Sequence, residues 1–364
     1  MPKFERLMSQ ITIDGLTIPN RIVFPAIHTG YTEPDGRISP KMKHFHSELA
    51  RGGVGLSIVG FTAVSAQGKF CPETPCLDDD RVVEGLAEVF RAIHDHGSVA
   101  AVQIAYAGRQ NRTGLEGMPI VAPSPIPCPD LKIVPRALSV DEIEAIENQF
   151  AEATARVRDA GVDMVQIHGA HGYLIHQFLS PLSNQRTDIY GGSLENRMLF
   201  LLNIVRKSRQ RVGPDFPLSC RINGQDYQEG GLTLDDARQI ARALAKEGIQ
   251  FLDVSGGVRG AERVRDEAMA TGDFRRLARS VREAAGVPVS CVGMITDLRT
   301  AEEILQENTS DMIAIGRALI ADPRLIKKSL RGEFDAINPC NKCNTCYYWI
   351  SGQPHLTCPV YGEW

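Results

Sequence analysis

Two histidines and a tyrosine lie close together in the sequence, directly after a short apolar segment. His168, His171 and Tyr173 follow the predicted strand 163–167, and a polar loop rich in Ser, Asn, Arg, Asp and Gly then continues to about residue 193. An imidazole donates a hydrogen bond to a developing oxyanion, and a phenol supplies a proton through a short, preorganised contact. The motif therefore favours a site that holds and protonates a carbonyl compound.

A zinc site is the alternative interpretation of the same imidazoles. Zinc needs a third protein ligand, and the helical spacing H-E-x-x-H of many zinc-binding histidine pairs is absent here. His176 follows in the same segment. It lies beyond the reactive part of the motif, so we predict a structural role for it.

The last 25 residues of the chain hold a second group of reactive side chains. Four of the nine cysteines, Cys340, Cys343, Cys346 and Cys358, form the pattern C-x2-C-x2-C-x11-C-P. In a reducing compartment such a group binds metal more often than it forms disulfides, and these spacings suit a [4Fe–4S] cluster. A structural zinc held by the same thiolates is the alternative, although zinc sites more often pair two C-x2-C units. We predict a short iron–sulfur-binding extension over 336–364.

The elements that must position these residues alternate regularly along the chain. Near-continuously apolar segments are predicted strands at 21–27, 56–60, 98–104, 163–167, 217–222, 251–255, 287–292 and 311–315. Helical patterns follow them at 40–51, 80–96, 139–160, 194–212, 234–248, 273–285, 299–307 and from Arg317 onward. This alternation indicates a parallel sheet, and the repeat without a dinucleotide-binding glycine fingerprint favours an α/β fold, a (β/α)8 TIM barrel over 1–335. Residues 10–18 alternate around Asp14-Gly15, which predicts a hairpin that serves as a lid on one end of the barrel.

Polar residues fall at the carboxyl ends of several predicted strands. His28 follows the first strand, Gln103 ends the third, His168 and His171 follow the fourth, and Arg221 ends the fifth. In a TIM barrel the chemistry lies at this end of the strands. The coincidence supports the fold and the site together.

Two glycines mark the ends of the last two strands. Gly293 and Gly316 stand at strand-to-helix turns, and Arg317 follows the second. Glycine lets backbone N–H groups face an anion, and the loops after strands 7 and 8 recurrently bind phosphate in this barrel. These residues suit one phosphate of a cofactor or substrate, and two ordinary tight turns are the alternative.

The composition and net charge of the chain limit the classes of binding partner. The 364 residues are 43% hydrophobic with a net charge of −4 and no long basic run, which disfavours nucleic acid or an anionic membrane as a partner. The N-terminus lacks an apolar signal core and no apolar stretch is long enough to span a membrane, so we expect a cytoplasmic protein acting on a small-molecule substrate. The oligomeric state is open, a homo-oligomer included.

The segment HGAHGYLIHQFLSPLSNQRTDIYGGSLENR resembles the old yellow enzyme family of FMN-dependent oxidoreductases, and the resemblance covers about residues 5–335. It implies that FMN lies across the barrel mouth. His168 and His171 would hold the substrate oxygen, and Tyr173 would be the proton donor. The resemblance further implies a set of flavin contacts: Pro25, Ala26, Ile27 and His28 beneath the ring edge, Gly60 and Phe61 from strand 2, Gln103 on the pyrimidine part, Arg221 near N1 and O2, and Gly293, Gly316 and Arg317 on the phosphate. A structural ion pair with Asp226 or Glu229 is the alternative for Arg221.

The cysteine extension and His28 resemble the branch that contains 2,4-dienoyl-CoA reductase, trimethylamine dehydrogenase, bile-acid enone reductases and clostridial enoate reductases. Those enzymes continue with FAD- and NAD(P)-binding domains, whereas this sequence ends at Trp364 and has no G-x-G-x-x-G. We therefore expect either a fragment of a longer enzyme or a separate electron-transfer protein or reductase as partner.

Three functions remain in competition. The favoured one is an ene-reductase that reduces a C=C bond conjugated to a carbonyl, carboxylate or thioester. The second is an amine dehydrogenase or N-demethylase, which would need an aromatic cage such as Phe61, Tyr106 and Trp349. The third is an electron carrier whose barrel only holds FMN, which the intact His168, His171 and Tyr173 disfavour.

Overall fold

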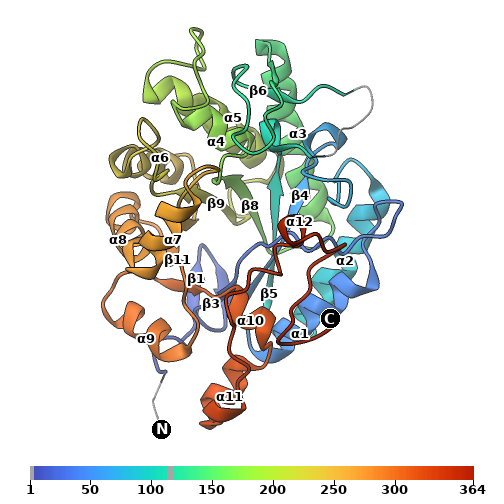
Figure 1. Cartoon of the computed structure of the whole chain (residues 1–364), viewed down its shortest axis with the longest axis vertical. Coiled ribbons are helices and arrows are strands. Elements are labelled where there is room, and N and C mark those ends of the chain that lie inside the picture. The colour runs from blue at the N-terminus through green and yellow to red at the C-terminus, as the bar shows by residue number, and fades with distance from the viewer. Residues whose placement is uncertain (1–3, 113–117) are drawn as a thin grey trace.

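Parallel strands close into a barrel in chain order, as predicted (Figure 1). The computed structural model describes residues 4–112 and 118–364. The barrel strands are β3 (Ile22–Phe24), β4 (Leu56–Ala63), β5 (Val99–Ala105), β8 (Met164–Gly169), β9 (Leu218–Asn223), β10 (Phe251–Ser255), β11 (Val289–Cys291) and β12 (Met312–Ala314). Pairing of β12 with β3 closes the ring. Each of the eight predicted strands is confirmed, and the fold is the expected (β/α)8 barrel.

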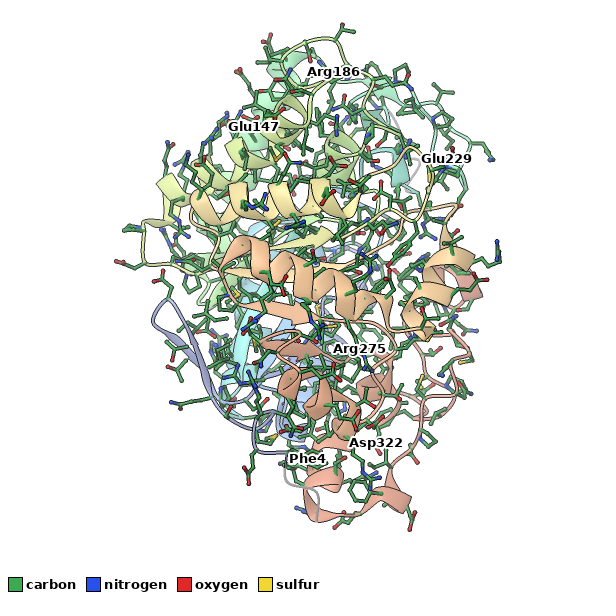
Figure 2. All side chains as sticks on the ribbon, turned by 90° about the vertical axis from the view of Figure 1, so that its left-hand side faces the viewer. Phe4, Glu147, Arg186, Glu229, Arg275 and Asp322 are labelled. Carbon is green, nitrogen blue, oxygen red and sulfur yellow. The ribbon has the colours of Figure 1, made fainter. Side chains whose placement is uncertain are left out.

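Helices cover the outside of this barrel. They are α1 (Pro40–Gly52), α2 (Asp80–His94), α3 (Val140–Asp159), α5 (Leu194–Val212), α6 (Leu234–Lys246), α8 (Asp273–Ala285), α9 (Leu298–Gln306), α10 (Arg317–Ala321) and α11 (Leu325–Arg331). Ser139 and Glu142 form a capping box at the start of α3, which satisfies free N–H groups of its first turn. Figure 2 shows α6 and α8 side by side on the outer face.

Two further helices lie where the sequence predicted loop. α4 (Leu174–Leu179) falls inside the segment 168–193, and α7 (Glu262–Ala270) falls inside 256–272. The prediction that helix resumes only near residue 193 is therefore wrong. All six residues of α4 are buried, so packing against the barrel stabilises a helix too short to form on its own.

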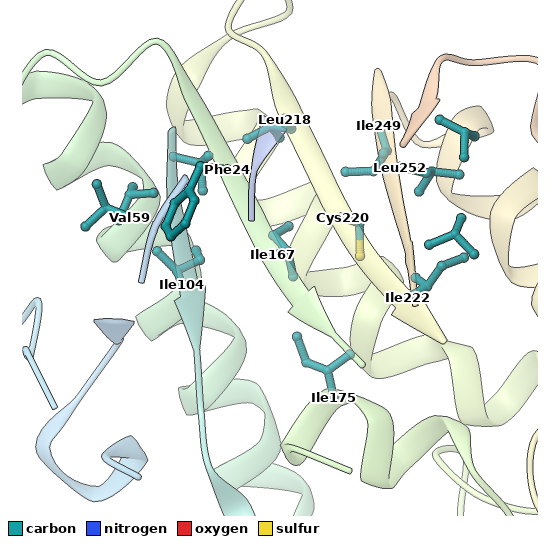
Figure 3. Close-up of a cluster of buried hydrophobic side chains, with 14 of the residues drawn as sticks. Phe24, Val59, Ile104, Ile167, Ile175, Leu218, Cys220, Ile222, Ile249 and Leu252 are labelled. Carbon is teal, nitrogen blue, oxygen red and sulfur yellow. The ribbon is translucent and has the colours of Figure 1, made fainter. Parts of the chain in front are cut away.

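The two faces of each strand have different partners. Ile104, Ile167, Cys220 and Leu252 point outward from β5, β8, β9 and β10 into the layer beneath the helices (Figure 3). The opposite face lines the barrel interior, where a separate apolar cluster contains Val23, Ile58, Ala101, Met164, Phe251 and Met312, all fully buried. Further along the same strands the interior residues become polar, which places the chemistry at the carboxyl ends.

The predicted hairpin is formed by β1 (Ile11–Ile13) and β2 (Leu16–Ile18). Asp14 and Gly15 both have positive φ at its turn, as a tight two-residue hairpin requires. Ile13 and Ile18 belong to the apolar cluster of the barrel interior. A hollow of about 620 Å³ lies beside the hairpin, far from the carboxyl ends of the strands, and is lined by Asp14 and Arg209 among others.

The C-terminal segment crosses the face of the barrel and returns to α1 (Figure 1). The short helix α12 (Tyr348–Ser351) lies on this path. The backbone N–H of Leu356 donates to the carbonyl oxygen of Thr29 at 2.7 Å, and the Trp364 ring packs on Phe45 of α1 at 4.5 Å between centroids. The extension is thus packed on the barrel. A short two-stranded sheet of β6 (Val121–Ala122) and β7 (Arg136–Ala137) lies in the loop 105–138.

Within the described residues, the helices are too short or too polar to cross a lipid bilayer.

Candidate active site at the barrel mouth

The structure brings the three predicted catalytic residues together. His168 lies near the end of β8, and its ring centroid is 5.3 Å from that of His171 and 4.9 Å from that of Tyr173. The contact of His168 Nδ1 with the backbone N–H of Ala170, long at 3.4 Å, assigns the ring proton to Nε2. In the described part of the chain, no third metal-binding side chain gathers with His168 and His171, which a zinc site would need.

His171 is held by contacts from three other segments. It has a left-handed φ of 60°, uncommon for a residue with a Cβ. Its backbone N–H donates to Asn223 Oδ1 at 3.2 Å, and its carbonyl accepts from Gln110 Nε2 at 2.7 Å. The ring Nε2 lies 2.8 Å from Ser255 Oγ. These contacts fix the ring beside His168.

The protonation states suit hydrogen-bond donation. Burial, reinforced by the Arg221 guanidinium, lowers the pKa of His168 and His171 well below the usual value, so both rings are neutral at pH 7. Burial raises the pKa of Tyr173 to about 12, opposed by the cations of Arg259 and Arg112. The site therefore presents two neutral imidazoles and a protonated phenol.

Arg221 pairs with a residue that the sequence did not suggest. Its Nε lies 3.1 Å from Asp253 Oδ2, and Nη1 donates to the carbonyl of Ala26 at 3.5 Å. The alternative pairing with Asp226 or Glu229 is wrong, because the register sets Asp253 directly opposite Arg221. Asp226 instead contacts His176 at 2.8 Å in a fully buried pair, as the structural role predicted for His176 requires.

The predicted flavin-contact segments converge at the mouth. A Cβ built on Gly60 would lie 2.9 Å from Gln103 Cβ and 3.5 Å from Ala26 Cβ, and one on Gly316 would meet Ile27 at 3.3 Å and Pro25 at 3.4 Å. Side chains at either glycine would fill the space between these segments. The lack of a side chain at both positions is therefore what lets the predicted flavin-contact segments approach one another so closely.

An unpartnered donor lies beneath this region. Gln103 Nε2 donates to Gln166 Oε1 at 2.7 Å, and Gln166 Nε2 is buried with no hydrogen-bond partner. A buried donor without a partner is costly. Its position next to Gln103 fits a bound molecule with acceptor atoms, as the pyrimidine part of FMN has.

The predicted phosphate residues follow neighbouring strands. Cys291 of β11 pairs with Ile313 of β12, so the turns at Gly293 and Gly316 lie at adjacent strand ends. Gly293 has a φ of 122°, which strongly favours glycine. Arg317 begins α10, and its Nη1 donates to Asn344 Oδ1 in the cysteine segment at 2.7 Å.

His28 and Phe61 belong to a mainly aromatic wall. His28 Nδ1 contacts the Tyr348 hydroxyl at 2.8 Å, and its Nε2 contacts Thr74 Oγ1 at 3.1 Å. Burial lowers the pKa of His28 to about 3, so this ring is also neutral. Phe61 lies 4.9 Å from Tyr173 between ring centroids.

The same wall continues into the C-terminal segment. Trp349 lies 5.5 Å from Phe70 between centroids, and its buried indole N–H has no partner. Of the three residues suggested for an aromatic cage, Phe61 and Trp349 belong to this wall. Tyr106 belongs to a different cluster, and its hydroxyl donates to Gln67 at 2.8 Å.

The four C-terminal cysteines gather in one region without closing a metal site. Cys343 is exposed, Cys340 and Cys346 are half-buried, and Cys358 is buried. Burial raises the pKa of Cys346 to about 11, and the other three thiols lie close enough to act on it. No three of them reach metal-binding geometry within the described chain. Metal ligation requires these thiols to be deprotonated, and the [4Fe–4S] cluster stays a prediction.

Several site residues escaped the sequence analysis. Gln166 lies two residues before His168 on the same face of β8, and strand periodicity alone could have identified it. Asp253 and Ser255 share the interior face of β10 in the same way. Tyr348 carried no such signal, because only the fold brings it to His28.

Comparisons with known proteins match this chain over almost the whole barrel. Residues 6–333 match the model of the NADH:flavin oxidoreductase / NADH oxidase family. An NADH oxidase of Thermoanaerobacter brockii is 40% identical over 94% of this chain and 54% of its own length. An NADPH dehydrogenase of Bacillus subtilis is 39% identical over 91% of this chain and 97% of its own length. The structure of a 2-naphthoyl-CoA reductase in complex with 2-naphthoyl-CoA superposes with a TM-score of 0.92 at 28% identity, over 98% of this chain and 57% of that one. The chain thus spans only about half the length of some relatives it matches.

Proposed function

Because this chain belongs to the NADH:flavin oxidoreductase / NADH oxidase family, we propose that it is an FMN-dependent ene-reductase. It would reduce a C=C bond conjugated to a carbonyl, carboxylate or thioester. The observation that carries this proposal is that the neutral imidazole of His168 lies beside both the neutral imidazole of His171 and the protonated phenol of Tyr173. With its Nδ1 facing the Ala170 N–H, His168 carries its proton on Nε2 and can donate from there to a substrate oxygen.

Each of the three residues has a separate task in this proposal. His168 and His171 donate hydrogen bonds to the substrate oxygen and so stabilise the negative charge that develops on it. Because both imidazoles are neutral, they polarise the oxygen without protonating it. Tyr173 delivers a proton to the α-carbon, and the aromatic rings around it keep water away.

The cofactor contacts are proposed residue by residue. FMN supplies hydride chemistry when it is bound. Gln103, together with Gln166, would hold the pyrimidine edge, and Arg221 would place a fixed cation beside it. The remaining contacts are Pro25, Ala26, Ile27 and His28 along the ring, Gly60 and Phe61 from β4, and Gly293, Gly316 and Arg317 at the phosphate.

We further propose that Cys340, Cys343, Cys346 and Cys358 bind a [4Fe–4S] cluster, whose chemistry is one-electron transfer. A separate electron-transfer protein or reductase would then be the partner of this chain. The other three thiols lie close enough to Cys346 to act on its pKa, which supports this proposal, and Arg317 is close enough to act on Cys343 and Cys346. On the opposite side of the barrel, the burial of Ile13 and Ile18 supports a lid role for the hairpin.

An amine dehydrogenase is the second candidate, favoured by the aromatic wall of Phe61, Phe70 and Trp349. Anaerobic titration separates the two. An enone reoxidises the reduced flavin of an ene-reductase, whereas a methylated amine bleaches the oxidised flavin of a dehydrogenase.

The experiment that tests the main proposal is stopped-flow reoxidation of the FMN-loaded, photoreduced protein by a simple enone. Removing one oxyanion donor costs ~10²–10³ in rate, so His168→Ala and His171→Ala should each slow reoxidation by about that factor. His44→Ala on the exposed face of α1 is the matched control. Unchanged rates in both site variants with flavin still bound would overturn the proposal.

A further inference from the structure

We propose that the substrate carries an anionic group, a carboxylate or a phosphate, at the end remote from the carbonyl, and that Arg112 and Arg259 bind this anion. This inference rests on the proposed ene-reductase function and specifies its substrate class. The two arginines come to the mouth from different loops and converge beside Tyr173.

The two guanidinium groups share one carboxylate. Arg112 Nη2 lies 3.7 Å and Arg259 Nη1 3.5 Å from the same oxygen, Oδ2 of Asp130. Both distances are long for a charge-assisted hydrogen bond, which is about 2.7–2.9 Å. Asp130 is 37% exposed, so it stands at the edge of the group. Among the residues that the structure describes, Asp130 is the only carboxylate paired with either guanidinium, so the group carries a net positive charge there.

Arg112 and Arg259 are held by protein contacts, and Arg112 has unused hydrogen-bonding capacity for a ligand. Arg112 Cζ lies 5.6 Å from the centre of the Phe70 ring, and its Nε is buried with no hydrogen-bond partner. A buried guanidinium N–H without an acceptor is costly unless a ligand supplies one. A planar anion with two oxygens provides the acceptors that Asp130 does not reach.

The same group is connected to the reacting residues. Arg259 Nε donates to Gln110 Oε1 at 3.2 Å, and Gln110 Nε2 donates to the carbonyl of His171 at 2.7 Å. Phe70 lies 5.9 Å from Tyr173 between ring centroids. Both cations also act on the Tyr173 phenol electrostatically. An anion bound by the arginines would therefore lie on the Tyr173 side of the mouth. One extended substrate could then reach both this anion site and the imidazole pair.

The test uses one enone in three forms: benzylideneacetone with a para-carboxylate, the methyl ester of that acid, and the para-phosphate. We expect kcat/KM of the acid or the phosphate to exceed that of the ester, and the two anions together identify which group the site prefers. Arg112→Gln and Arg259→Gln should each lower the anion-to-ester ratio about tenfold or more, because each removes a charge-assisted hydrogen bond. The preference should shrink with added salt.

A variant that is expected to strengthen anion binding distinguishes a loss of the anion site from misfolding. Asp130→Asn removes the competing carboxylate, so it should raise the affinity for the acid and leave that for the ester almost unchanged. Arg263→Gln is the matched control, since Arg263 pairs with Glu267 on the exposed face of α7. It should change nothing.

Equilibrium dialysis of the acid and the ester provides a readout without turnover. If no form is reduced but the acid binds better than the ester in an arginine-dependent way, the ene-reductase proposal fails and the anion site stands. If the enones are reduced but acid and ester behave alike in every variant, the anion site is overturned and the function stands. Equal losses for acid and ester in both arginine variants would also overturn it.

Discussion

The imidazole of His28, four residues after β3, lies 2.8 Å from the phenol oxygen of Tyr348 in the C-terminal segment. The two residues are 320 positions apart in the chain. The rings are also stacked, with centroids 5.6 Å apart and planes inclined by 22°. The cysteine-bearing segment is therefore joined by a buried polar contact to the strand end that would lie beneath the flavin.

Replacing Tyr348 by Phe should destabilise the protein. The change leaves His28 Nδ1 buried without a partner, which costs about 1–3 kcal/mol. Urea unfolding monitored by fluorescence measures the loss. Tyr347→Phe is the matched control, because no hydrogen bond of the Tyr347 hydroxyl occurs among the described residues. Equal stability of the two variants would contradict a structural role for this contact.

Replacing Tyr173 by Phe should slow reoxidation of the reduced flavin by an enone by about 10²–10⁴, the usual contribution of a positioned acid. The same variant should react with molecular oxygen at the wild-type rate, since that reaction does not need the α-carbon proton. Stopped-flow measurements with each oxidant separate the two. A Phe variant that loses both rates equally has a damaged flavin site instead.

Acid should destabilise the fold through its buried histidines. Burial lowers the pKa of His28 and His46 to about 3, and it also lowers the pKa of His168 and His171 well below the usual value. The unfolded chain binds more protons than the native state between these values and about 6.5. The stabilisation present above pH 6.5 is therefore lost as pH falls toward 3, by up to about 1.4 kcal/mol per pH unit for each histidine.

His46→Asn isolates one of these contributions, because His46 lies away from the mouth and contacts Ser57 Oγ at 2.9 Å. The variant should be less stable at pH 7.5 but should lose stability less steeply on acidification. Urea titrations at several pH values give the slope. An unchanged slope would show that His46 is not neutral in the native state.

Replacing Cys358 by Ser should remove iron and labile sulfide from anaerobically purified protein while FMN stays bound. The reason is that the predicted cluster needs all four thiolates. Metal and sulfide analysis measures the loss, and Cys128→Ser, which alters a buried free cysteine elsewhere, is the control. Zinc without sulfide in the wild type would establish the structural zinc site instead.

The sequence was sufficient for features that depend on local patterns. Apolar runs located every barrel strand, and the polar residues at their ends located the mouth. The first strand was predicted too long, as 21–27 rather than Ile22–Phe24, because Pro25 has no N–H to continue the ladder.

Features that depend on register or on distant contacts could not be predicted. The Arg221–Asp253 pair follows from the alignment of β9 with β10, and the convergence of Arg112 and Arg259 on Asp130 follows from the folding of two separate loops. Helix α4 forms in a segment of mixed pattern only because the barrel buries it. In each case the deciding interaction joins residues that no short window contains.

The fully buried apolar cluster around Met164 and Phe251 has a kinetic consequence for the enzyme. Among the described residues, this cluster fills the barrel interior on the side away from the strand carboxyl ends with apolar side chains, so we expect reactants to enter at the mouth. An electron donor that acts directly on the flavin ring and an electron acceptor would both have to use the barrel mouth. They would therefore react in turn, and the first product would depart before the second reactant enters.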